Sequence, residues 1–276
     1  MASDNPQQAQ AQAGPKPPHP LVQAIEDLGR GAIDMVSDLG GLVTLGFDVG
    51  RWSVRRPYRW HNLFAQLDFV GVGSVFIVLL TGLFTGMVFA HQSSRAFEMF
   101  DAESLVGPTV ALTLTRELAP VFSALMVTMR AGSAMCTELG TMRVTEQVDA
   151  LETMAVNPVQ YLLVPRVLAG LLMVPILTLL FDTSGILGSY FVSVSVKGLS
   201  AGTFLARTRQ WLDPEDVFEG LIKGAVFGLS VALVCCFKGY NASGGAKGVG
   251  KATTEAMVSS ALSIFILDFI VGLLMH

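Results

Sequence analysis

The sequence predicts an all-α polytopic membrane protein, in which an N-terminal interfacial amphipathic helix is followed by five transmembrane helices. Composition and the grouping of the apolar residues carry this prediction. The 276 residues are 51% hydrophobic and only 14% charged, whereas about 25% of the residues in an average soluble domain are charged. The mean hydropathy is +0.55. These values argue against an ordinary soluble domain and exclude a disordered chain, which needs low hydrophobicity and high charge.

Five apolar runs are long enough to cross a bilayer. A helix that spans the ~30 Å hydrocarbon core needs about 20 mostly apolar residues, because each residue rises ~1.5 Å. The predicted spans are about 69–90, 105–129, 167–196, 217–237 and 256–275. The first contains no formal charge, and the second is apolar except for Arg116 and Glu117.

The N-terminal part of the chain has a different pattern. Residues 1–20 are rich in Gln, Ala and Pro and are expected to form a disordered tail that is not a signal peptide. In residues 21–66, apolar side chains recur at three- and four-residue steps from Ile25 to Val43, which predicts an amphipathic helix. A basic, aromatic stretch ending at Trp60 favours a position in the membrane interface. The alternative is a helix packed on the spans from the cytoplasmic side. Residues 67–276 form the predicted transmembrane domain.

The distribution of Lys and Arg predicts the orientation. Twelve of them lie in the N-terminal region or in the connections between spans two and three and between spans four and five, and four lie on the opposite side. The positive-inside rule therefore places the N-terminus in the cytoplasm. Five spans then place the C-terminus on the far side of the membrane.

Several classes of function find little support in the sequence. A net charge of −4 argues against a nucleic-acid binder. The three cysteines and four scattered histidines give no disulfide framework and no metal site, so no cofactor is expected. The stretch Gly245–Ala252 is one residue away from a phosphate-binding loop, but Ala252 cannot supply the hydroxyl that such a loop offers to Mg²⁺. We interpret it as a flexible, basic cytoplasmic turn, which means that any ATP hydrolysis occurs on another chain.

Arg116 and Glu117 are candidate functional residues, because a charge at the bilayer centre costs about 2.5–3.5 kcal/mol on insertion scales. Neighbours in sequence lie about 100° apart on a helix and do not face each other. Either the two side chains line a wet cavity, or they make structural polar contacts between helices.

Residues 138–158 form the second candidate region. Val144, Val148 and Leu151 make an apolar stripe at helical spacing, with Glu146, Asp149 and Glu152 on the other side. This predicts a short amphipathic helix at about 144–155, on the cytoplasmic side between spans two and three. It is either a solvated loop helix or a helix on which a partner docks through its acidic face.

Glycines at four-residue spacing are a third signal, because such pairs let helices approach closely in lipid. They are Gly82 and Gly86 in the first span and Gly220, Gly224 and Gly228 in the fourth. Packing within the chain is preferred over a subunit interface for any one pair.

From about Leu67 to its end, the chain resembles the MlaE/YrbE-type permeases of MCE-associated ABC lipid transporters. The resemblance rests mainly on the block E-L-G-T-M-R-V-T-E-Q-V-D-A-L-E-T-M-A-V-N-P at 138–158. Shorter matches are T-R-E-L-A-P-V at 115–121, R-A-G-S-A at 130–134, V-P-R at 164–166, F-K-G-Y at 237–240, K-A-T-T at 251–254 and L-D-F at 267–269. Residues 1–20 lie outside it.

The resemblance implies a homodimeric permease of the bacterial inner membrane that moves phospholipid or a related lipid between the inner and outer membranes. It implies a cytoplasmic ABC ATPase, a periplasmic MCE-domain protein and a small STAS-domain protein that binds the ATPase. Arg116 and Glu117 would lie near the lipid cavity. The 138–158 segment would be the coupling helix on the ATPase, with these charged residues as coupling candidates: Glu138, Arg143, Glu146, Asp149 and Glu152.

We therefore expect a non-catalytic transmembrane subunit, with ATP hydrolysed on a partner chain. Two alternatives remain open at the level of sequence. One is a non-conducting membrane scaffold for an ATPase and a periplasmic protein. The other is an ion-coupled secondary transporter, which would not need the ATPase.

Overall fold

The computed structural model describes residues 20–55 and 60–275, with side chains described at Ile33 and from Val36 onward. All regular structure in these ranges is helical. Five helices are long and apolar enough to cross a membrane, namely Trp60–Glu98, Glu103–Val144, Val159–Val196, Pro214–Tyr240 and Gly245–Met275. The all-helical class and the five spans are thereby confirmed.

The individual helices follow one another along the chain with short connections. Their bounds are α2 Pro20–Ser53, α3 Trp60–Leu67, α4 Gly73–Glu98, α5 Val106–Thr113, α6 Ala119–Val127, α7 Ser133–Val144, α8 Gln147–Thr153, α9 Val164–Tyr190, α10 Ala201–Trp211, α11 Pro214–Tyr240 and α12 Gly245–Met275. The helices α3 and α4, the helices α5 to α7, and the helix α9 with its flanking turns form the first three spans.

Five π-helical turns occur within these first three spans. They are Asp68–Val72, Leu114–Leu118, Thr128–Gly132, Val159–Leu163 and Phe191–Val196. A π-turn inserts one extra residue into an α-helix, and such turns are frequent at functional sites. One of the five, Leu114–Leu118, contains both Arg116 and Glu117.

The first, second and fourth span helices are extended at both ends beyond the predicted apolar run, and the third and fifth are extended only at their starts. The second predicted span ends at 129, for example, but its helix continues to Val144 and includes Glu138 and Arg143. Hydropathy marks only the part of a helix that suits lipid, whereas the flanking polar residues retain helical geometry. Arg130 and Arg166, assigned to a connection from the sequence, consequently lie inside helical spans.

The chain divides into two units, before and after the boundary at Thr44 and Leu45, and α2 runs through this boundary. In the first unit, Ile33, Val36, Leu39 and Val43 follow one another at three- and four-residue steps on α2. Residues 1–19 of the predicted tail 1–20 and the basic residues among 56–59 lie outside the described residues, as do the side chains of Ile25 and Leu28, whereas Pro20 begins α2.

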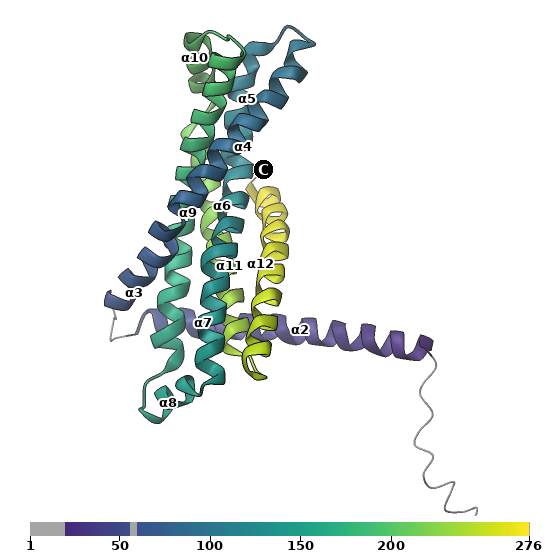
Figure 1. The fold of residues 1–276 in the computed structure, drawn as a ribbon, viewed down its shortest axis with the longest axis vertical. Helices are drawn as coiled ribbons and strands as arrows, with labels where there is room; N and C mark the ends of the chain where they lie inside the picture. The colour runs from purple at the N-terminus through teal and green to yellow at the C-terminus, as the bar shows by residue number, and fades with distance from the viewer. Residues whose placement is uncertain (1–19, 56–59, 276) are drawn as a thin grey trace, which may run out of the picture. The chain divides into compact units, whose positions relative to one another are not determined.

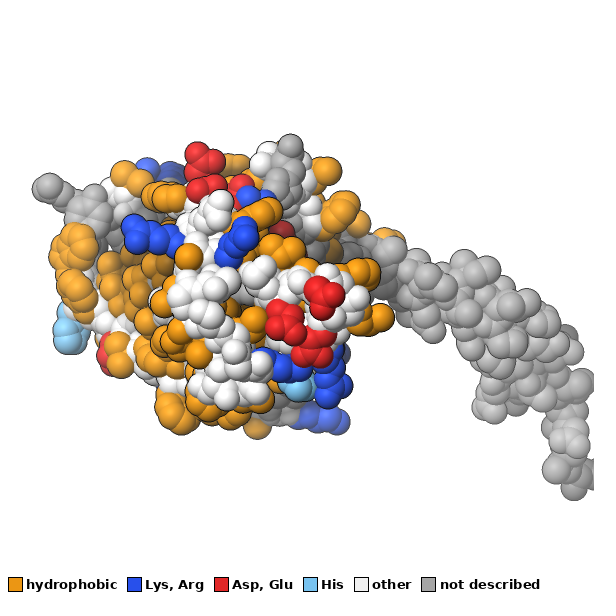
Figure 2. All heavy atoms as spheres, turned by 90° about the horizontal axis from the view of Figure 1, so that it is seen from above, with side chains coloured by type: hydrophobic (Ala, Val, Ile, Leu, Met, Phe, Trp, Pro, Cys, Tyr) orange, Lys and Arg blue, Asp and Glu red, His pale blue; other side chains and the backbone are white. Residues whose placement is uncertain are grey.

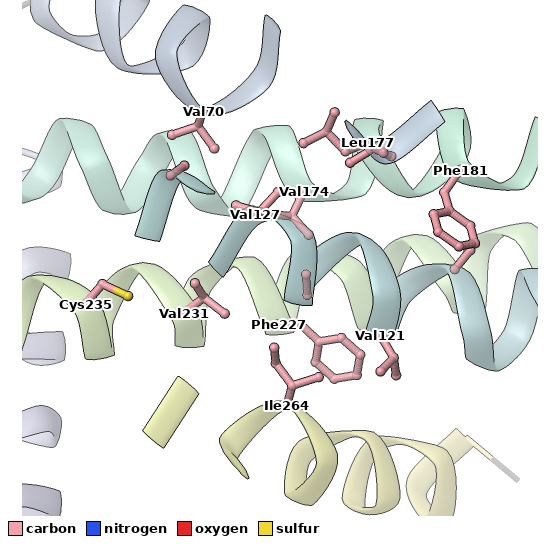
Figure 3. Packing of buried hydrophobic residues seen from close by; sticks show 14 of the residues in the cluster. Val70, Val121, Val127, Val174, Leu177, Phe181, Phe227, Val231, Cys235 and Ile264 are labelled. Atoms are coloured by element: carbon pink, nitrogen blue, oxygen red, sulfur yellow. The ribbon is translucent and has the colours of Figure 1, made fainter. Parts of the chain in front are cut away.

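The second unit is built around α9, which packs against α4, α6 and α11. Figure 3 shows apolar side chains from several helices meeting in this interior, with Phe227 of α11 facing Ile264 of α12 and Val121 of α6. Phe181 of α9 is fully buried and its ring stacks on that of Phe122, with centroids 6.1 Å apart.

The glycines at four-residue spacing let these helices approach closely. A Cβ on Gly86 would collide with the carbonyl oxygen of Gly185, and one on Gly228 with that of Gly170. A Cβ on Gly220 would likewise collide with the carbonyl oxygen of Thr115. These glycines therefore pack against other helices of the same chain.

Two features of the connections differ from the sequence prediction. The first is α10, which lies between spans three and four at the end of the second unit opposite α8 (Figure 1). Its buried Phe204 and Thr208 pack on Gly107 of α5, so tertiary packing rather than hydropathy forms this helix. The second is Gly245–Ala252. The prediction of a flexible turn there is wrong, because these residues form the first two turns of α12 and bury Val249 and Ala252.

Candidate functional site

Arg116 is tied to the start of the fourth span. Its Nε donates a hydrogen bond to Oδ1 of Asp216 over 2.7 Å, and its Nη2 lies 2.5 Å from the same oxygen. A second carboxylate, Oε2 of Glu219, lies 3.8 Å from Nε. The guanidinium therefore faces two carboxylates of α11.

Asp216 is held rigidly by the beginning of α11. The N-cap is Asp213, whose side chain accepts a hydrogen bond from the backbone of Asp216, and Oδ2 of Asp216 accepts one from the backbone nitrogen of Asp213 over 2.9 Å. This reciprocal arrangement satisfies two backbone donors at the helix start. A capping carboxylate thus also binds Arg116, and it connects the second span to the fourth.

Glu117 takes part in a separate ion cluster. Nζ of Lys223 donates to Oε2 of Glu117 over 2.8 Å and lies 3.2 Å from Oδ1 of Asp268. Lys223 is buried, and the three residues come from spans two, four and five. The neighbours Arg116 and Glu117 thus contact different residues of α11.

A groove lies beside these charges. We call it the charged groove; its volume is about 390 Å³, and it is lined by Leu112, Thr113, Arg116, Glu117, Trp211, Asp213 and Asp216. An apolar pocket of about 300 Å³ shares Leu112, Thr113 and Trp211 with it, and extends to Phe97, Leu105, Pro108 and Thr109. The two hollows form a continuous surface that is charged at one end and apolar at the other. The side chains of Arg116 and Glu117 thus make ion pairs between helices and also line the charged groove.

The surface at the α10 end is polar. Figure 2 looks onto this end and shows acidic side chains grouped beside basic ones, with apolar side chains on the flanks. One ion pair here joins Lys197 after the third span to Glu98 at the end of the first.

A second set of charged residues lies around α8, at the other end of the second unit (Figure 1). Glu138 on α7 pairs with the buried Arg166 on α9 over 2.7 Å. Arg143 lies 2.6 Å from Oδ1 of Asp149, and its guanidinium is 5.6 Å from the ring centroid of Tyr240. Three of the five coupling candidates therefore make ion pairs in this region.

The helix at the centre of this region is shorter than the predicted 144–155. Helix α8 covers Gln147–Thr153, because Glu146 adopts a left-handed conformation with φ of 59° and separates it from α7. Val148 of α8 is buried, whereas the side chains of Glu146 and Glu152 are exposed. The acidic residues thus face away from the bundle.

The sequence indicates Arg116 and Glu117 as candidates but does not indicate their partners. Glu219, Lys223 and Asp268 are visible in the sequence as charges within predicted spans, and charges at membrane depth generally pair with one another. That rule signals that partners exist, whereas the particular pairs depend on tertiary packing. Trp211 had no comparable signal, because its position depends on α10.

The chain is similar over most of its length to known permeases. The family model described as "Permease MlaE" matches residues 63–274. A probable ABC transporter permease protein of Rickettsia bellii is 39% identical over 251 residues, which cover 91% of this chain and 97% of that protein. The intermembrane phospholipid transport system permease protein MlaE of Haemophilus influenzae is 37% identical over 260 residues, covering 92% and 98% of the two chains. The chloroplastic protein trigalactosyldiacylglycerol 1 of Arabidopsis thaliana is 40% identical over 213 residues, covering 77% and 61%.

Proposed function

This chain belongs to the MlaE permease family, and from that premise we propose that it moves phospholipid or a related lipid between the inner and outer membranes. As an ABC transporter permease it is a multi-pass, non-catalytic membrane subunit, and it partners with an ATPase subunit. The transported lipid, the route through the chain and the further partners are the proposal.

The observation that carries the proposal is the continuity of the charged groove with the apolar pocket. A phospholipid has a charged head and apolar chains, and a site for it needs an apolar wall with a few polar groups. Arg116 and Glu117 line the charged end, and Trp211 lines both parts. In this assignment Arg116 and Glu117 contact the lipid headgroup.

The region around α8 is proposed as the contact with the ATPase. Glu146 and Glu152 are exposed, and Asp149 makes an exposed pair with Arg143, so an acidic surface is available to a basic one on the partner. Glu138 and Arg143 lie at the end of the second span helix, which contains the π-turn with Arg116. A push on α8 is therefore transmitted along this helix toward the groove.

The remaining elements of the proposal concern topology and partners. Arg143, Lys238, Lys247 and Lys251 lie near the α8 end, which supports a cytoplasmic location for that end and for the N-terminus. The groove then opens toward the periplasmic side of the inner membrane, where an MCE-domain protein would receive lipid. A second copy of the chain and a STAS-domain protein on the ATPase complete the proposed complex. The region 21–66 is proposed to lie in the interface, since the apolar residues of α2 share one face.

Site-specific photo-crosslinking tests the lipid route. A crosslinking residue at Thr113, which lines both parts of the groove, should capture several times more phospholipid than one at Leu172, an exposed apolar position on α9. The scaffold alternative predicts equal capture at the two positions, and equal capture would contradict the proposal. Transport that proceeds without the ATPase would favour the secondary-transporter alternative instead.

A further inference from the structure

We propose that the charged groove selects phospholipids whose headgroup is zwitterionic and carries an ammonium group, and that it disfavours headgroups with a net negative charge. This inference rests on the proposed function, because it assumes that a lipid headgroup enters the groove. It is carried by the balance of charges around the groove and by the placement of Arg116 and Glu117.

The balance of charges is strongly acidic. The groove and its ion pairs contain two basic groups, on Arg116 and Lys223. Against them stand five carboxylates, on Glu117, Asp213, Asp216, Glu219 and Asp268. Five against two leaves a formal excess of three negative charges.

Two nearby sources of positive charge do not offset this excess. The N-terminus of α11 carries a partial positive charge, but the Asp213 and Asp216 carboxylates already bind its backbone donors. The arginines of α10, Arg207 and Arg209, are exposed and line neither the charged groove nor the apolar pocket. A phosphate that enters the groove therefore meets mostly carboxylates.

Arg116 and Glu117 together match a headgroup that carries both signs. Their side chains are 38% and 45% exposed, in contrast to the buried Lys223, and both line the groove. The bonds of Arg116 to Asp216 use Nε and Nη2, and a guanidinium carries two further donors on Nη1. Arg116 can thus donate to the phosphate while Glu117 accepts from the ammonium of the same molecule.

A headgroup that lacks an ammonium group would place its phosphate in the charged groove without a positive charge on the same molecule. Because charges interact more strongly near apolar surfaces than in bulk water, the surrounding carboxylates would repel it. The apolar pocket contacts only the acyl chains, so it contributes equally to both classes of lipid. The difference in affinity should therefore come from the headgroup alone.

Trp211 provides a built-in reporter, because it lines both parts of the groove. Replacing the other two tryptophans, Trp52→Phe and Trp60→Phe, leaves it as the single indole in the full-length chain. The chain in an uncharged detergent is titrated with phosphatidylethanolamine or phosphatidylglycerol carrying the same brominated acyl chains, which quench tryptophan fluorescence on contact. We expect half-maximal quenching at about fivefold to tenfold lower concentration for phosphatidylethanolamine, the range that a charge interaction of modest strength produces.

Charge-neutralising variants test whether a preference for phosphatidylethanolamine arises from the charges of the groove. Asp213→Asn removes a charge from its lining and keeps a good N-cap, and Glu219→Gln removes a second charge by an independent route. Each variant should reduce the ratio of the two half-maximal quenching concentrations by about twofold to threefold. The matched control is Glu215→Gln, an exposed residue in the same helical turn that does not line the groove, and it should leave the preference unchanged.

The possible results separate this inference from the proposed function. Quenching that is equal for the two lipids, or stronger with phosphatidylglycerol, overturns the headgroup preference but leaves lipid binding in place. A preference that is unchanged in both Asp213→Asn and Glu219→Gln also contradicts the inference, because it would not arise from the charges of the groove. Absence of quenching with either lipid contradicts the proposed function itself.

Discussion

Both ends of the bundle contain ion pairs with one buried member, and the α8 end has in addition a pair whose two members are both exposed. In the ion pairs of the groove residues Arg116 and Glu117, the partners Asp216 and Lys223 are each 3% exposed, and so is Arg166, the partner of Glu138 near α8. Near α8, Arg143 and Asp149 are 37% and 53% exposed. Exposed pairs contribute about 0–1 kcal/mol and exchange partners readily, whereas removing one member of a buried pair is costly. Arg116 and Glu117 at the groove are thus held by buried partners, whereas Glu146, Asp149 and Glu152 near α8 are exposed and available to another protein.

The largest expected effect comes from Lys223→Met, which tests the fixed character of the groove. The substitution leaves Glu117 and Asp268, which are 45% and 23% exposed, without their shared cation. Breaking a fully buried pair costs about 3–5 kcal/mol, and the partial exposure of the two carboxylates places the cost here toward the lower end of that range. The thermal unfolding midpoint in detergent should fall clearly.

A matched variant separates lost charge pairing from lost packing. Combining Lys223→Met with Glu117→Gln and Asp268→Asn removes all three charges, and it should recover much of the lost stability, because neutral replacements of buried ion pairs are often tolerated. If the triple variant is as unstable as the single one, the ion cluster is not the source of the effect.

Reversing the acidic surface of α8 tests whether these charges serve a partner. Glu146→Lys, Asp149→Lys and Glu152→Lys together should abolish co-purification of the ATPase, because the proposed contact depends on opposite charges. The unfolding midpoint of the permease should fall only slightly, since the three side chains are exposed and the Arg143–Asp149 pair that is lost is exposed as well. Retention of the ATPase at the normal ratio would argue against the assignment of α8 as the contact.

The smallest effect is expected from Arg143→Ala. It removes an exposed pair with Asp149 and a contact with the Tyr240 ring, which together contribute about 0.5–2 kcal/mol. The loss of stability, measured as a shift in unfolding midpoint, should be well below that of Lys223→Met. A loss of equal size would remove the distinction between the two ends.

The sequence predicts those helices whose residues are selected by the surrounding lipid, independently of how the helix packs on other helices. The run 69–90 predicts a span because lipid selects apolar side chains along the whole helix. Helix α10 contains Arg207 and Arg209 and has no such run, and it depends on Phe204 and Thr208 packing on another helix. The helix at Gly245–Ala252 escaped prediction for the same reason, since its glycines weaken any local helical signal.

The candidate site likewise contains residues that the sequence indicates and residues that only tertiary packing determines. Arg116 and Glu117 are recognisable from the sequence because charge in an apolar run is expensive. Their partners Asp216 and Lys223 lie about 100 residues further along the chain, and only the packing of the spans determines which carboxylate meets which cation. The groove itself requires Trp211, and therefore requires α10.

The π-turn at Leu114–Leu118 has a consequence for the length of the second span helix. One surplus residue in the turn rotates everything before it by about 100° relative to everything after it. Deleting a single residue there would leave an unbroken helix of ordinary pitch. The part of the helix that bears Leu112 would then be rotated relative to the part that bears Phe122. The deletion would therefore preserve the helix but would change the direction in which one of its two parts faces.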